Sequence, residues 1–118
     1  AQVIFPDNTR RRWAATLGDE FKGGDCHAGR YESSIILKAD PEGVREEKRV
    51  ALEPVEIGLV ERIRGGAKSF RECGADQAYC GAPAEASAAE GEAHIEQLAN
   101  MIVTSIEEAW PELFGAAS

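Results

Sequence analysis

Two residues of this 118-residue chain have types and spacing suited to proton-transfer chemistry, His27 and Glu32. They lie in the segment HAGRYE, and three nearby glycines surround the histidine, at positions 23, 24 and 29. Glycine lets a backbone turn sharply and approach a ligand closely. An imidazole has an ordinary pKa of about 6.5, so it exchanges protons at neutral pH. The pattern predicts a histidine presented from a loop, where it can act as a general acid or base.

Glu32 precedes Ile35 and Ile36 by the spacing that puts residues on one helix face. If that face turns into a core, the carboxylate turns inward with it. A buried carboxylate requires a metal ion, a cation or a hydrogen-bonded imidazole. We therefore expect Glu32 to be paired with His27 or with a metal. The alternative is that Glu32 caps the helix or forms a local ion pair, and that His27 is an ordinary polar loop residue.

The elements that must position this loop are read from turn residues and apolar spacing. Gln2–Phe5 is expected to be a short strand, and a helix is expected from about Arg10 to Leu17. The helix that carries Glu32 should end near Ala39, because Asp40-Pro41 disfavours its continuation. Residues 45–57 are charged and contain a proline, so they are expected to form a long surface connection. A short helix is expected around 59–63 and a further turn at 69–73.

The C-terminal region carries the clearest periodicity. A long helix is expected from Pro83 to about Trp110, with Pro111 ending it. Its apolar residues recur every three or four positions and make one stripe: Ile95, Leu98, Ile102, Ile106 and Ala109. His94 is expected to be solvated on this helix. One strand followed by helices suits an α/β layer, although one strand cannot make a sheet by itself.

Charge and cysteine content narrow the function classes. The net charge of −8 and the pI of about 4.8 argue against nucleic-acid binding, which needs clustered Lys and Arg. The basic run Arg10-Arg11-Arg12 is short and precedes Trp13, which favours a solvated helix face or an interface. No apolar run reaches membrane-spanning length. Three cysteines without paired spacing favour a reducing compartment, so a cytoplasmic location is expected.

Cys26, next to His27, raises a zinc or thiol alternative. Adjacent residues on an extended loop point in opposite directions, and no second cysteine follows at a zinc-finger spacing. A catalytic or metal-bound Cys26 is therefore disfavoured, and Cys80 is expected to be a small packing residue.

Two blocks of sequence carry a family resemblance. The first is His27-Ala28-Gly29-Arg30-Tyr31-Glu32-Ser33-Ser34, followed by an aliphatic run and Asp40-Pro41-Glu42-Gly43-Val44. The second runs from Gly65-Gly66 through Ala78-Tyr79-Cys80-Gly81-Ala82-Pro83 to Gly91. In this order the two blocks resemble the creatininase (creatinine amidohydrolase) family. Ala82 stands where the family pattern has an aspartate, and this loss of an N-cap should cost about 1 kcal/mol.

The resemblance implies a three-layer α/β/α fold and a metal-dependent hydrolase of an amide or cyclic amide C–N bond. It implies that His27 is the active-site histidine and that Glu32 completes the site by orienting His27, accepting protons or binding a metal. Two divalent ions per site are implied, Zn, Mn or Fe. We expect the small amide substrate to contact the same loop through Gly24, Asp25, Cys26, Ala28, Gly29 and Tyr31. Creatininase itself has tryptophans near its substrate, whereas Trp13 is the one tryptophan before His27 in this sequence. The resemblance therefore does not favour creatinine as the substrate.

The family's first-half metal-ligand motifs, a Glu-x-His pair, an Asp and a further His, are absent here. Residues 1–118 therefore resemble the C-terminal part of a single creatininase-like domain. The missing strands and metal ligands would come from an N-terminal half or a partner subunit, in a homo- or hetero-oligomer that could be hexamer-like. The competing hypothesis is a non-catalytic interaction subunit that keeps the fold. Neither hypothesis involves nucleic acid or a membrane.

Overall fold

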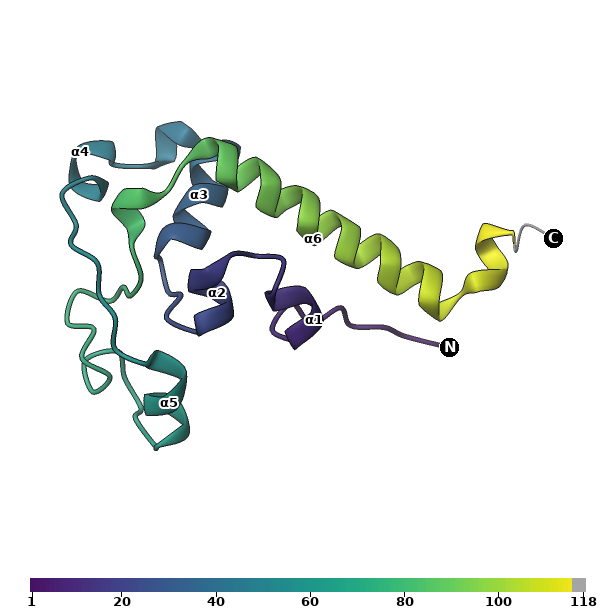
Figure 1. Cartoon of the computed structure of the whole chain (residues 1–118), viewed down its shortest axis with the longest axis horizontal. Coiled ribbons are helices and arrows are strands. Elements are labelled where there is room, and N and C mark those ends of the chain that lie inside the picture. Colours follow the sequence, from purple (N-terminus) through teal and green to yellow (C-terminus); the bar gives the residue numbers. More distant parts are fainter. Residues whose placement is uncertain (116–118) are drawn as a thin grey trace.

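The computed structural model describes residues 1–115, and this part of the chain is helical (Figure 1). Its elements in chain order are α1 (Arg11–Ala14), α2 (Asp19–Gly23), α3 (Arg30–Ala39), η1 (Pro41–Gly43), α4 (Glu46–Arg49), α5 (Leu59–Arg64), η2 (Pro83–Glu85), α6 (Ala88–Ala109) and η3 (Pro111–Phe114). Residues 1–6 are extended and lead into α1.

The main packing contact of the molecule is between α3 and α6 (Figure 1). Tyr31 and Ser34 form the buried face of α3, and Gly91 is buried on the first turns of α6. Because Gly91 has no side chain, the two helix backbones approach closely at Ser34; a Cβ at position 91 would overlap the Ser34 carbonyl. The crossing holds the N-terminal end of α3, and with it the histidine loop, against α6.

A second, smaller packing unit lies around α5, which projects away from α6 (Figure 1). Leu59, Cys73 and Cys80 are buried together, and the partly buried Val55, Ile57 and Ala67 pack against them. The Tyr79 hydroxyl donates to the Glu53 carbonyl at 2.7 Å. Arg49 connects the end of α4 to the segment just before α6. Its guanidinium donates to the carbonyls of Pro83, Ala84 and Ala86 at 2.7 to 3.4 Å.

The expected three-layer α/β/α fold is not found, and that prediction was wrong for residues 1–115. The described residues contain two isolated β-bridges, His27 with Cys80 and Val55 with Gly81, and no sheet. Gln2–Phe5 is not the expected strand, because no described segment pairs with its backbone. A strand needs a partner for its N–H and C=O groups, and none of the described segments supplies a ladder.

The dimensions of the molecule agree with this lack of layers. Its radius of gyration is 17.0 Å and its extents are 55 × 36 × 23 Å. A compact domain of this length has a radius of gyration of about 13 to 14 Å. Val3 and Phe5 remain 86% and 87% exposed, so a sizeable apolar surface is left uncovered.

Several local predictions need correction. Residues 45–57 contain the short helix α4 rather than a plain connection, and α2 was not anticipated. Pro83 begins the 3-10 turn η2, and α6 itself starts at Ala88, where the Ser87 hydroxyl accepts the Glu90 N–H at 3.2 Å. No helix within residues 1–115 is both long enough and apolar enough to cross a bilayer.

The predicted apolar stripe of α6 faces partly outward. Ile95 and Ile102 are 40% and 47% exposed, whereas Gly91 and Met101 form the buried side. His94, expected to be solvated, packs against Tyr31 with ring centroids 4.9 Å apart. The helix itself was predicted correctly, but its buried face was not. The buried face is the one that contacts α3, and it contains Gly91 rather than the apolar stripe.

Candidate functional site

His27 lies on the loop between α2 and α3 and is held by two contacts from the second sequence block. Its carbonyl accepts the Cys80 N–H at 2.9 Å, and its own N–H donates to the Cys80 carbonyl at 3.4 Å. Its ring stacks on Phe70, with centroids 4.0 Å apart and ring planes 14° from parallel. The backbone bridge and the stacked ring together fix the plane of the imidazole, which stays half-buried.

The Glu32 carboxylate lies next to the histidine. Its Oε2 accepts the Ala28 N–H at 2.5 Å, and that N–H belongs to the peptide that joins His27 to Ala28. The Glu32 carboxylate therefore contacts the backbone directly after His27, and the catalytic roles of the two residues stay predictions. Glu32 is exposed, however, so the prediction of an inward-facing carboxylate was wrong. The buried face of α3 starts one residue earlier, at Tyr31.

Ala28 takes a left-handed conformation, with φ of +50°. This region costs a non-glycine residue about 1 kcal/mol. Two hydrogen bonds hold Ala28 in this turn. The Ala28 N–H donates to the Glu32 carboxylate, and the Ala28 carbonyl accepts the Ser33 hydroxyl at 3.4 Å. The short link between His27 and α3 is thus a defined turn that is held from both sides.

Asp25 is engaged with the backbone of the α5 region. Its two carboxylate oxygens accept the N–H groups of Ile57, Gly58 and Leu59 at 2.7 to 3.0 Å. Partial burial alone would raise its pKa, but the three donors outweigh burial and hold the pKa of Asp25 below its usual value. Asp25 therefore anchors the loop to α5. Its predicted contact with substrate stays a prediction.

The thiols beside the loop are protonated at neutral pH. Burial raises the pKa of Cys26 to about 11, and the charges of Glu32, Glu20 and Asp25 add to the effect. Burial likewise raises the pKa of Cys80 to about 11. Since the thiolate is the nucleophile and metal ligand, neither residue is poised for that chemistry.

The remaining predicted contact residues have different surroundings. Tyr31 is buried between Phe21 and His94, with ring centroids 4.5 Å and 4.9 Å away, and burial raises its pKa. Gly24 ends α2 in the left-handed region, with φ of +84°. Gly29 is buried against Glu20 and the Cys80 carbonyl.

A cleft of about 640 Å³ is lined by residues of α2, α3 and α6, together with parts of the connecting segments. Asp25 and Tyr31 contribute to its wall, but His27 and Glu32 do not. Its polar lining includes Asp19, Glu20, Arg30, Glu56, Glu85, Glu90 and His94. Two of the predicted substrate-contact residues, Asp25 and Tyr31, therefore line the cleft. The two catalytic candidates, His27 and Glu32, lie outside it.

The residues described here do not make a metal centre on their own. Within positions 1–115, no group of three or more His, Cys, Asp and Glu side chains is placed to hold a metal ion. Glu32 has one oxygen committed to Ala28, which leaves Oε1, and His27 offers its imidazole. This is at most part of a donor set, so the described residues alone do not fit a divalent-metal site.

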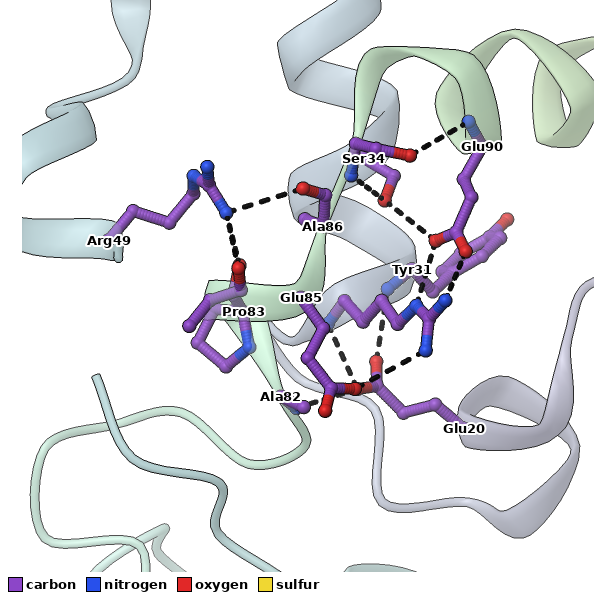
Figure 2. A network of polar contacts seen from close by, with 12 residues as sticks. Glu20, Tyr31, Ser34, Arg49, Ala82, Pro83, Glu85, Ala86 and Glu90 are labelled. Atoms are coloured by element: carbon purple, nitrogen blue, oxygen red, sulfur yellow. Dashed lines mark hydrogen bonds and ion pairs between the residues drawn. The ribbon is translucent and has the colours of Figure 1, made fainter. Parts of the chain in front are cut away.

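A network behind the loop was missed by sequence reasoning (Figure 2). Arg30 donates through Nε to Glu90 at 2.8 Å, pairs with it a second time through its terminal nitrogen, and reaches Glu85 at 3.2 Å. The Arg30 hydrogen bonds lower the pKa of Glu90. The Ser34 hydroxyl accepts the Ser87 N–H at 3.1 Å and lies 3.5 Å from Glu90. These contacts tie the first turn of α3 to the start of α6.

Glu20 was also missed, although the sequence holds a signal for it. Gly29 is the N-cap residue of α3 and has no side chain with which to accept the helix's first N–H groups. Water or an acceptor from elsewhere in the chain must therefore satisfy these groups. The structure shows that Glu20 does so, accepting the N–H groups of Arg30 and Tyr31.

Comparison with known proteins matches this chain to one family. The family model described as creatininase, creatinine amidohydrolase, matches residues 2–106. Two curated relatives are similar, the mycofactocin precursor peptide peptidases of two strains of Mycobacterium tuberculosis, CDC 1551 and H37Rv. Each is 39% identical over an alignment of 71 residues. The match covers 58% of this chain and 27% of the relative's length. No solved structure matches the chain significantly.

Proposed function

Because this chain belongs to the creatininase family, we propose that it carries the histidine-bearing part of a metal-dependent hydrolase that cleaves an amide C–N bond. The observation that carries the proposal is the contact of the Glu32 carboxylate with the peptide next to His27, at 2.5 Å. The family motif contains both His27 and Glu32, and this contact supports the proposal that they act together. The similarity to a precursor-peptide peptidase supports an amide bond as the target.

In this proposal His27 moves the proton that amide hydrolysis requires. The leaving nitrogen must gain a proton as the C–N bond breaks, and an imidazole supplies one near neutral pH. Stacking on Phe70 and pairing with Cys80 hold the ring in one plane, so little reorganisation is needed before transfer. Glu32 keeps one oxygen on the Ala28 N–H and has the other available to orient a neighbouring group.

The metal is the second part of the proposal. A bound divalent ion, Zn, Mn or Fe, would polarise the amide carbonyl and ease deprotonation of water. Since the described residues do not complete a donor set, we assign most ligands to an N-terminal half or a partner subunit. Glu32 is this chain's candidate to contribute a ligand beside them, through Oε1.

A second candidate is a non-catalytic interaction subunit, which the exposed apolar residues favour. Val3, Phe5, Ile102 and Val103 are between 47% and 87% exposed. Exposed apolar residues that form a contiguous patch mark contact sites with other chains, and these four are the candidates for such a patch. The two candidates differ in metal content, because a hydrolase must hold divalent metal in its complete assembly and an interaction subunit need not.

The proposal is tested on the complete assembly by His27→Ala, with release of free amine from short peptides and from a cyclic amide as the assay. We expect amine release to fall by about a hundredfold or more, the usual contribution of a general acid or base. His94→Gln changes the chain's other histidine and serves as the matched control. Retained turnover in a folded His27→Ala assembly would refute the role of His27.

A further inference from the structure

The Glu20 side chain accepts three backbone hydrogen bonds from two distant segments (Figure 2). Its Oε2 accepts the Arg30 N–H at 2.9 Å and the Ala82 N–H at 2.7 Å. Its Oε1 accepts the Tyr31 N–H at 3.0 Å. One carboxylate on α2 therefore joins the first turn of α3 to the segment that follows Cys80.

Two glycines make room for this carboxylate. A Cβ on Gly29 would lie 2.6 Å from Glu20 Oε1, and a Cβ on Gly81 would overlap Oε2. Gly81 has φ of +94°, a conformation that glycine adopts without strain. Both positions flank the bridged pair of His27 and Cys80, so the backbone at this point is shaped to receive the Glu20 side chain.

The three donors bracket the histidine loop. Ala82 lies two residues after Cys80, whose backbone pairs with His27, and Arg30 lies three residues after His27. The N-terminus of α3 favours a negative charge, and Gly29 offers no side-chain cap there. A carboxylate that holds both ends of this arrangement limits movement of His27 and of the Ala28 turn.

We propose that Glu20 is a positioning residue for the proposed amide hydrolysis, because its carboxylate fixes the loop that carries His27 and the Ala28 N–H bound by Glu32. It acts through the backbone and touches neither of those side chains. The effect of Glu20 on catalysis rests on the proposed function. The effect of Glu20 on the mobility of the His27 loop can be measured without any activity.

Two substitutions separate the charge of Glu20 from its length. Glu20→Gln keeps the length, but its amide nitrogen must face at least one N–H donor, so at least one hydrogen bond is lost. Glu20→Asp keeps the charge but is one methylene shorter, so it cannot reach both segments in the same way. Asp40→Ala is the control, because it removes the cap of η1 at the end of α3 that lies opposite the histidine loop.

The first readout is amide hydrogen exchange in the folded chain. Arg30, Tyr31 and Ala82 lose protection if Glu20 serves only as a local cap. Positioning predicts that the Ala28 and Cys80 amides, which do not bind Glu20, also exchange faster, by about tenfold, the effect of one lost charge-assisted hydrogen bond. The His27 ring-proton resonances should shift as well, because stacking on Phe70 loosens. Asp40→Ala should leave all of these signals at their original values.

The second readout is kinetic and uses the complete assembly. Both Glu20 variants should lower kcat by about tenfold, because displacement of the loop moves the His27 imidazole away from its place beside the reacting bond. Unchanged exchange at Ala28 and Cys80 in both variants, with loss confined to Arg30, Tyr31 and Ala82, would overturn the proposal. If His27→Ala remains active, the proposed function fails, while an exchange effect of Glu20 at Ala28 and Cys80 still stands.

Discussion

Gly91 of α6 lies against the main-chain carbonyl of Ser34 on α3 so closely that no side chain fits between the helices. Gly91→Ala should therefore destabilise the protein, although alanine favours a helix over glycine by about 1 kcal/mol. We expect a net loss of about 1 to 3 kcal/mol in the free energy of unfolding, as for overpacked cores. Chemical denaturation of the assembled protein measures it. Gly23→Ala is the control, since a Cβ there meets nothing within 4 Å.

Glu32→Gln distinguishes the hydrolase from the interaction subunit. The neutral amide keeps the shape of the side chain but removes the charge, so the metal affinity of the assembly should fall by about ten- to a hundredfold. Because Glu32 is exposed, the melting temperature without metal should change little. Metal analysis and thermal unfolding of this variant provide both values. Unchanged metal content together with a less stable fold would support the interaction-subunit hypothesis.

His94 should make stability depend on pH in the weakly acidic range. Burial against Tyr31 lowers its pKa, Arg30 acts in the same direction, and Glu90 and Glu20 oppose the shift. The unfolded chain then binds a proton at a higher pH than the folded chain does. This contribution to stability is complete above about pH 6.5 and is lost as the pH falls through the lower, folded pKa. Denaturation midpoints between pH 5 and 8 should show a smaller slope in His94→Gln than in the wild type.

The isolated chain should self-associate. Its exposed apolar residues include Ile102 and Val103 on α6, at 47% and 50% exposure. Sedimentation velocity should show a mass that rises with concentration, and the double change Ile102→Asn with Val103→Asn should reduce it. Val50→Asn alters one exposed valine of α4's C-terminal end and should have little effect. A monomer with a cooperative thermal transition would contradict this expectation.

The sequence predicted helices that have strong local signals. The helix bearing Glu32 ends where Asp40-Pro41 stops it, and the last helix ends before Pro111, as expected. The existence of these helices follows from apolar spacing and prolines, which act within a few residues. Which face is buried does not, because that depends on the partner: α3 packs through Tyr31 and Ser34 rather than through Ile36.

The candidate site was predicted only in its local part. The HAGRYE segment predicted a role for His27 and Glu32, and a local turn at Ala28 places the Glu32 carboxylate on the backbone N–H that follows His27. Contacts from Phe70, Cys80 and Glu20 come from other segments, so no spacing rule could show them. The expected sheet failed for a similar reason, since strands form only with a partner, and the described residues provide two isolated bridges.

Those two bridges also bear on how this sequence can change during evolution. His27 pairs with Cys80, and Val55 pairs with Gly81, each as a single contact with no ladder beside it. In a β-ladder, an inserted residue shifts the pairing of every residue that follows it in the strand. With a single bridge, an insertion changes only the loop in which it occurs. Insertions and deletions among related sequences should therefore gather in the α5 segment, between residues 60 and 68. The intervals from Glu20 to Glu32 and from Cys80 to Pro83 should keep a constant length.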